Sequence, residues 1–424
     1  MHKLYSFLTY TASPLVPLWL ALRRAQGKED PSRWRERFGY ASLARPKGKL
    51  AWFHAASVGE AASLLPLLAQ LSERFPALNL LMTTGTVTSA ALMKARLPAR
   101  VMHQYVPVDT PQATARFIRH WRPNYAFWTE SEFWPNLIDA TNRSQAFMGI
   151  INARLSERSF RGWNYFPGFA SHLLRSFDVV FAQSAADGAR LAALGASQVI
   201  VSGNLKFDAP MLPCDESQLM TLQTALASRP AWLAASTHPG EEKMVGRVHA
   251  LLAATRPDFL TLLVPRHPSR GAEIAALLGK EFRVARRSAG EPLRADTQIY
   301  IADTLGELGL FYRLAELVFM GGSLVAHGGQ NPLEPARLSC ALLAGPHTHN
   351  FRDIYGDLEQ AHALARVQSA EQLASELDRL LRDTAHRQRL QKAARQFVET
   401  RSGALGLLLR LLGPVFTPKP ARRA

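Results

Sequence analysis

The chain is organised around the stretch Phe319–Ala336, which reads FMGGSLVAHGGQNPLEPA. It continues an apolar run that predicts a buried strand, and it then breaks at two glycine pairs, where backbone can pass close to a ligand. Asn331, Pro332 and Glu334 next predict a helix start, as an N-cap, a first helical residue and a carboxylate three residues past the cap. A helix start at the end of a strand offers free amides to a phosphate, and Glu334 can accept hydrogen bonds from a ribose. A glycine-rich turn with a capping box explains the same residues, so nucleotide binding and an ordinary turn are both open at this point.

Short apolar runs alternate with helical patterns along both halves of the chain. Helical stretches such as 60–71 and 186–194 lie between several of these runs, and strands separated in this way predict parallel sheets with crossover helices. The pattern pauses at 203–217, which contains two prolines and predicts a linker. The predicted strands are 50–54, 78–83, 101–106, 125–130, 146–152, 179–183 and 199–201 in the first half, and 232–235, 260–264, 282–285, 299–302, 317–320 and 341–343 in the second.

Length and composition are typical of a globular protein with more than one core. A chain of 424 residues is too long for one compact domain, and a hydrophobic content of 47% excludes a disordered chain. We expect a membrane-anchoring segment at 1–22, a first domain at 23–204, a linker at 205–217, a second domain with its closing helices at 218–412, and a basic tail at 413–424.

The charge balance predicts an anionic partner. Lys+Arg 50 against Asp+Glu 34 gives a formal net charge of +16, which suits nucleic acid, anionic lipid or a phosphorylated substrate. The basic residues are spread along the chain without a nucleic-acid motif, so we expect no nucleic-acid partner. Cys214 and Cys340 are far apart and have no metal or redox spacing, which indicates a reducing compartment without a disulfide framework.

The N-terminal run 4–22 carries no charge and is close to the ~20 residues that a helix needs to cross a bilayer. Pro14 and Pro17 interrupt it, so a segment that lies partly inserted in one leaflet is also open, as is a buried core helix. Basic residues follow immediately, from Arg23 to Arg37, and predict that the next domain lies on the cytoplasmic side.

The loop Trp52–Glu60 leaves a predicted strand and enters a predicted helix. It contains no G-x-G-x-x-G, which disfavours a dinucleotide oxidoreductase. Ser57 and Glu60 have the spacing of a capping box, so a helix-capping carboxylate is the simpler interpretation of Glu60. His54 is equally well explained as an ordinary hydrogen-bonded histidine at a strand end.

Three further strand ends carry polar residues. Glu130 and Glu132 lie beside aromatic residues and suit either a sugar site or a solvated helix start. Arg266 and His267 end another strand, and arginine binds phosphate through its charge and its fork geometry. At 303–308, Thr304 and Glu307 predict a capping box whose amides can also face a phosphate.

With these loops identified, the sequence resembles the 3-deoxy-D-manno-octulosonic acid (Kdo) transferases of lipopolysaccharide biosynthesis over nearly the whole chain. One departure from the family pattern is Gln330, where the family often has His, and it bears on the local donor contact but not on the assignment to the family. The matching motifs are 52–60, 129–136, 149–159, 203–208, 236–242, 265–268, 303–308 and 321–336.

The resemblance implies a GT-B glycosyltransferase, an α/β architecture of two doubly wound Rossmann-like domains facing a cleft, in which the first binds the acceptor and the second the donor CMP-Kdo. It implies that Glu60 is the general base of an inverting transfer to the lipid A precursor, lipid IVA. No cofactor is implied, and no metal-ligand cluster occurs at a predicted strand end. The implied CMP contacts are Arg266, His267, Gly306, Glu307, Leu308, Asn331, Pro332, Leu333 and Glu334.

The acceptor carries phosphates on an acyl-chain anchor, which suits both the apolar N-terminus and the excess of positive charge. We expect the enzyme on the cytoplasmic side of the inner membrane, in contact with its anionic lipid surface. Glu130, Glu132, Arg154, Arg158 and Arg161 are the candidate acceptor residues, although a solvated basic loop explains the three arginines equally well. The alternatives are a GT-B enzyme that uses a UDP-sugar on a membrane lipid, and a non-catalytic protein that binds anionic lipid.

Overall fold

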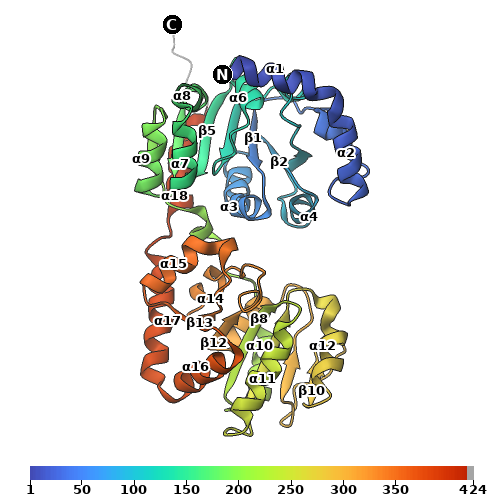
Figure 1. Ribbon diagram of the computed structural model, residues 1–424, viewed down its shortest axis with the longest axis vertical. Coiled ribbons are helices and arrows are strands. Elements are labelled where there is room, and N and C mark those ends of the chain that lie inside the picture. The colour runs from blue at the N-terminus through green and yellow to red at the C-terminus, as the bar shows by residue number, and fades with distance from the viewer. Residues whose placement is uncertain (418–424) are drawn as a thin grey trace. The chain divides into compact units, whose positions relative to one another are not determined.

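The computed structural model describes residues 1–417 and divides into two α/β units (Figure 1). The first unit contains Met1–Ala209 and the chain from Ser402 onward, and the second contains Pro210–Arg401. The last part of the predicted basic tail, 418–424, lies outside the described residues.

The first unit is built on a parallel sheet of seven strands in the order β3-β2-β1-β4-β5-β6-β7. The order reverses between β1 and β4, and in doubly wound sheets ligands bind beyond the carboxyl ends of the strands at such a switch point. The strands are β1 Leu50–Ala55, β2 Asn79–Thr84, β3 Val101–Tyr105, β4 Tyr125–Thr129, β5 Phe147–Ala153, β6 Val179–Ala182 and β7 Val199–Val201.

Helices cover both faces of this sheet (Figure 1), because successive side chains of its strands point to opposite faces and both faces are apolar. Phe53 stacks on Phe127 on one face, whereas Trp52 packs against Trp128 and Phe117 on the other. The helices are α3 Val58–Arg74, α4 Val87–Arg96, α5 Pro111–Trp121, α6 Pro135–Arg143, α7 Glu157–Asn164, α8 Pro167–Leu174 and α9 Ala185–Ala193.

The apolar N-terminal run forms two helices, α1 His2–Ala12 and α2 Val16–Ala25, joined by the 3₁₀ turn η1 Ser13–Leu15. Pro14 lies in η1 and Pro17 near the start of α2, where a proline without its N–H is tolerated. Within residues 1–417, no helix is both long and apolar enough to cross a bilayer. A second 3₁₀ helix, η2 Trp34–Phe38, follows before β1.

The second unit repeats the doubly wound plan, with the parallel strand order β10-β11-β9-β8-β12-β13-β14 and its switch point between β8 and β12. Its strands are β8 Ala231–Thr237, β9 Leu260–Pro265, β10 Val284–Arg286, β11 Ile299–Ile301, β12 Leu317–Met320, β13 Ala341–Ala344 and β14 Leu364–Arg366. Its helices are α10 Glu216–Leu226, α11 Glu241–Ala253, α12 Gly271–Leu278, α13 Leu308–Leu314, α14 Leu333–Arg337, α15 Arg352–Gln360, α16 Ala370–Arg382 and α17 Thr384–Glu399, with 3₁₀ turns η4 Pro268–Arg270 and η5 His349–Phe351.

The strands predicted from the sequence are all present, with small shifts at their ends, and β14 is the strand that was missed. It is a three-residue strand at the sheet edge, paired with β13. Its sequence, Leu-Ala-Arg, is too short to form a clear apolar run. The prediction of an α/β protein with two Rossmann-like halves is confirmed.

The last helix, α18 Ala404–Phe416, packs in the first unit (Figure 1), so the prediction that 402–412 belong to the second domain is wrong. The prediction that a basic tail begins at 413 is also wrong, because 413–416 form the end of this helix. Phe416 contacts the rings of Phe75, Tyr125 and Phe127 in the core of the first unit. Asp208, in the 3₁₀ helix η3 Leu205–Asp208, accepts the backbone N–H of Gly403 at 2.6 Å. This hydrogen bond attaches the start of α18 to η3. The part of the predicted linker that forms η3 therefore also belongs to the first unit.

Candidate active site

The switch point of the second unit holds a pocket with a cavity volume of about 270 Å³. At this switch point the backbone at the end of β8 and the backbone that follows β12 approach closely: a Cβ on Gly321 would lie 2.3 Å from the carbonyl oxygen of Ser236. Ser236 itself lines the pocket at a bulge of β8 and has φ +58°, a left-handed conformation that is costly for residues other than glycine. Such strain persists where surrounding structure enforces it, and it is often found at ligand sites.

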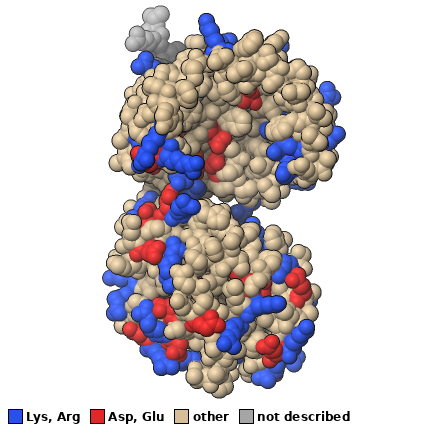
Figure 2. Space-filling view, viewed as in Figure 1, with Lys and Arg blue, Asp and Glu red and all other residues tan. Residues whose placement is uncertain are grey.

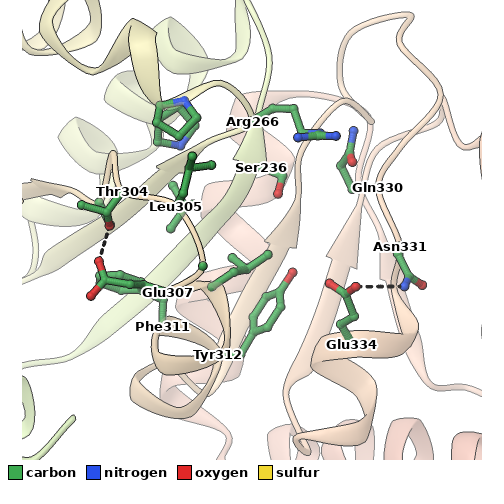
Figure 3. Close-up of a pocket in the computed structure, with 16 residues that line it drawn as sticks. Ser236, Arg266, Thr304, Leu305, Glu307, Phe311, Tyr312, Gln330, Asn331 and Glu334 are labelled. Carbon is green, nitrogen blue, oxygen red and sulfur yellow. Dashed lines mark hydrogen bonds between the residues drawn. The ribbon is translucent and has the colours of Figure 1, made fainter. Parts of the chain in front are cut away.

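The pocket collects most of the residues predicted to bind the donor. In the view of Figure 3, Thr304, Leu305 and Glu307 lie on one side, Asn331 and Glu334 on the other, and Tyr312 between them. Of the predicted donor residues, Arg266, Gly306, Glu307, Leu308, Asn331 and Glu334 line the pocket, whereas His267, Pro332 and Leu333 do not. Among the other lining residues, Ser236 lies in a matching motif without an assigned role, and Phe311 and Tyr312 lie outside the matching motifs.

Arg266 follows the end of β9 and is exposed to solvent. Within residues 1–417, its side chain has no hydrogen-bond or ion-pair partner. A guanidinium that makes no contact with protein acceptors keeps its donors for a ligand, and its fork geometry matches phosphate oxygens. His267 is also exposed, and its ring lies perpendicular to that of His238 at 6.2 Å between centroids.

Glu307 does not form the capping box predicted with Thr304. The helix α13 begins at Leu308, three residues later than a cap at Thr304 requires, and the Glu307 carboxylate instead binds Arg287, with one contact of 2.6 Å from Nε. The hydroxyl of Thr304 also donates to this carboxylate. Hydrogen bonds from Arg287 lower the pKa of Glu307, so the group stays ionised and can accept further hydrogen bonds from a ligand in the pocket.

Asn331 and Glu334 are coupled at the start of α14, although the helix begins at Leu333, one residue later than predicted. Asn331 Oδ1 accepts the backbone N–H of Leu333 at 3.1 Å, and its Nδ2 donates to Glu334 Oε1 at 3.3 Å. Gln330, the departure from the family pattern, lines the pocket and places its amide nitrogen 2.9 Å from Nε2 of His238. The amide thus contacts the loop that follows β8.

The switch point of the first unit carries Glu60. The predicted capping box is confirmed: Ser57 Oγ accepts the backbone N–H of Glu60 at 3.3 Å, and Glu60 Oε2 accepts the N–H of Ala56 at 2.9 Å. Ser57 also donates its hydroxyl to Glu60 Oε1 at 2.6 Å. Burial raises the pKa of Glu60 despite these hydrogen bonds, and the charges of Glu130 and Glu132 raise it further. The carboxylate is therefore oriented by its cap and more basic than usual.

Glu130 and Glu132 follow β4, the neighbour of β1 in the sheet, so the fold brings them toward Glu60. Glu130 has φ +58°, and its carboxylate forms a salt bridge with Lys206 at 2.7 Å. Burial raises the pKa of Glu132, which accepts a hydrogen bond from Trp134 Nε1 at 2.9 Å. Lys206 lies in the matching motif 203–208, but the sequence assigns it no role, because its partner Glu130 is far away in the chain.

The candidate acceptor arginines lie at the end of β5 and on α7. Arg154 is half-buried, whereas Arg158 and Arg161 are exposed. Arg161 pairs with Glu157 at 3.2 Å, and Arg190 contacts the same carboxylate. Arg161 and Glu157 are both exposed, so this ion pair is compatible with a solvated basic loop as well as with an acceptor site.

Two other sequence expectations concern histidine and metal. His54 is buried against Thr83, and burial lowers its pKa to about 3, as expected of a core histidine. Within residues 1–417, one group of side chains has ligand atoms close enough together to share a metal ion, and it lies away from both switch points: His2 on α1, Asp139 on α6 and His172 on α8.

Comparison with known proteins shows the family of the chain. Residues 32–209 match the family described as 3-Deoxy-D-manno-octulosonic-acid transferase (kdotransferase). The chain is 36% identical to the 3-deoxy-D-manno-octulosonic acid transferase of Haemophilus influenzae, over 97% of each chain, and 32% identical to that of Rickettsia bellii, over 98% of this chain and all of the other. The structure of a glycosyltransferase from Rickettsia africae is similar in fold, with a TM-score of 0.53 at 15% identity over 88% of this chain and 98% of the other. The chain belongs to the family of 3-deoxy-D-manno-octulosonic acid (Kdo) transferases.

Proposed function

We propose that this enzyme transfers Kdo from CMP-Kdo to the lipid A precursor lipid IVA with inversion, that Glu60 is the general base, and that it works at the cytoplasmic face of the inner membrane. The observation that carries the donor assignment is the pocket at the switch point of the second unit, where six of the residues implied by the family resemblance converge.

The pocket has the chemistry that a nucleoside monophosphate requires. Arg266 is a cation without a protein partner among residues 1–417, and it suits the phosphate. Glu307 and Glu334 are acceptors for ribose hydroxyls or for the amino group of a cytosine. As the bond between the sugar and CMP breaks, the leaving phosphate gains charge, which Arg266 stabilises.

The environment of Glu60 supports its role as the base. In the proposed step the acceptor hydroxyl attacks the anomeric carbon of Kdo, the bond to CMP breaks, and the hydroxyl proton passes to Glu60. A raised pKa makes the carboxylate a stronger proton acceptor, and the capping hydrogen bonds hold it in one orientation. Inversion follows because a single displacement needs one base and no enzyme nucleophile.

The surface of α1 supports contact with a membrane. The helix docks on the first unit through polar side chains: Tyr5 donates to Asp109 at 3.0 Å, and Asn136 donates to Thr9 at 2.9 Å. Its apolar residues point outward instead, and Leu4, Phe7 and Leu8 are 54%, 62% and 55% exposed.

This arrangement is the reverse of an ordinary surface helix, whose apolar stripe faces the core. The face shown in Figure 2 is mostly uncharged over α1. A helix with an apolar outer face and basic residues after it suits an anionic bilayer surface, where each basic residue contributes ~1 kcal/mol.

The proposal is tested by mass spectrometry of the product formed from CMP-Kdo and purified lipid IVA. Addition of Kdo is the expected result, and an unchanged acceptor would refute the assignment of donor or acceptor. Competition between CMP and UDP for the enzyme separates the proposed donor from a UDP-sugar. Membership of a transferase family already favours an enzyme over the non-catalytic lipid binder.

A further inference from the structure

The switch point of the second unit contains a buried acid that lies outside the donor pocket. Glu241, the first residue of α11, is 0% exposed. Its Oε2 accepts the backbone N–H of Gly322 at 2.6 Å and that of His238 at 3.0 Å. Its Oε1 accepts those of Ser323 and Leu324, both at 3.1 Å. One carboxylate thus satisfies four backbone amides from two loops.

Successive amides that converge on one point form a nest for an anion. In the glycine-rich loop after β12, the protein's own carboxylate fills that nest. The amides of Gly322, Ser323 and Leu324 are therefore already used within the protein, and the phosphate of a donor must be neutralised by other groups, such as Arg266.

A short chain of contacts connects Glu241 with the pocket. The carbonyl oxygen of Gly322 accepts the N–H groups of Gly328 and Gly329 at 3.1 and 2.8 Å, which closes the loop on itself. Gln330 and Asn331 follow directly and line the pocket.

The loop after β8, which contains His238, also contacts the loop after β12 through side chains. The ring of His238 stacks on that of His327 at 3.6 Å between centroids, and Gln330 contacts the same His238. The two loops that border β8 and β12 are thus joined at Glu241 and at Gln330.

We propose that Glu241 is a positioning residue for the donor: it holds the loop Gly321–Gly329 closed and so keeps Gln330 and Asn331 in place in the pocket. The identity of the donor, CMP-Kdo, rests on the proposed function. The role of the carboxylate as a latch rests only on its contacts.

Hydrogen exchange and calorimetry on Glu241→Gln test the latch. An amide group at this position turns donors toward backbone N–H groups, so we expect at least tenfold faster exchange of the amides of Gly322, Ser323 and Leu324. CMP affinity should fall about tenfold, or ~1.4 kcal/mol, because the binding-competent loop is populated less often. Glu36→Gln is the matched control: Glu36 is a buried carboxylate of the first unit that accepts the N–H of Tyr105 at 2.7 Å. It should leave both measurements unchanged.

Chemical rescue gives a second, independent test. Glu241→Ala leaves the nest empty, and formate at millimolar concentration should restore loop protection and CMP affinity toward wild-type values. Unchanged exchange and unchanged CMP affinity in the Gln variant would overturn the proposal. So would a general loss of stability with normal CMP affinity well below the melting temperature, since that identifies an ordinary core residue. Failure of wild type to bind CMP would refute the donor assignment, while exchange and its rescue by formate would still decide the role of Glu241.

Discussion

Replacing Glu60 by Gln separates its hydrogen bonds as a helix cap from its proposed role as the general base. Gln keeps one carbonyl oxygen for the N–H of Ala56 or the hydroxyl of Ser57, so one of the two side-chain hydrogen bonds survives. Loss of the other costs about 0.5–1.5 kcal/mol of folding free energy. Loss of the base costs ~10²–10⁴-fold in rate, equivalent to ~3–5 kcal/mol of barrier. The variant should therefore fold and bind CMP, yet transfer Kdo very slowly.

The raised pKa of Glu60 adds a pH signature. A carboxyl whose pKa is higher in the folded state stabilises the fold below its unfolded pKa, and this contribution is lost as pH rises through the folded value. This contribution is therefore absent at neutral pH, and replacing Glu60 by Gln loses none of it there. Catalysis has the opposite dependence, because the base must be ionised. The wild-type rate should fall as pH drops through the raised pKa of Glu60. The residual rate of the Gln variant should not show this fall at low pH.

The assay is initial-rate transfer from CMP-Kdo to detergent-dispersed lipid IVA, with thermal unfolding and CMP calorimetry on the same preparations. Ser369→Ala is the matched control, because it removes the N-cap of α16 at a cost of ~1 kcal/mol and leaves the hydrogen bonds of Glu60 in place. Its rate should stay within a few-fold of wild type. Transfer by Glu60→Gln within about threefold of wild type would refute the reasoning, since that lies far below the range for a general base.

Three other predictions concern the donor, the membrane and the core. Arg266→Ala and Glu334→Ala should each weaken CMP binding in calorimetry without changing retention on acceptor-containing membranes, and unchanged CMP affinity in both would place the nucleotide elsewhere. Exchanging the exposed Phe7 and Leu8 for Ser should release the protein from anionic vesicles in high salt, where screening removes the charge attraction, while transfer to detergent-dispersed acceptor persists; continued retention would move the anchor off α1. Phe416→Ala should destabilise the first unit by ~3–5 kcal/mol in denaturant unfolding and leave CMP affinity intact, whereas a change below 1 kcal/mol would mean that α18 contributes little to that core.

Residues close together in the chain were predicted well because their contacts depend on local geometry. The cap formed by Ser57 and Glu60 spans one helical turn, so its spacing alone is sufficient evidence. The alternation of apolar runs and helices likewise determines that the sheets are parallel and doubly wound. Several family motifs lie at these strand ends, and for that reason six of the nine residues predicted to bind the donor line one pocket.

Other features were decided only by tertiary structure. Glu307 has the spacing of a cap, yet Arg287, twenty residues earlier in the chain, takes its carboxylate. The periodicity of α18 predicts a helix but cannot say which core it joins. Lys206 finds Glu130, and Glu241 finds the amides after β12, because the order of strands brings distant loops to one switch point. Local sequence sets the elements and their caps, whereas pairing between distant charges and amides depends on the strand order, which no short stretch of sequence encodes.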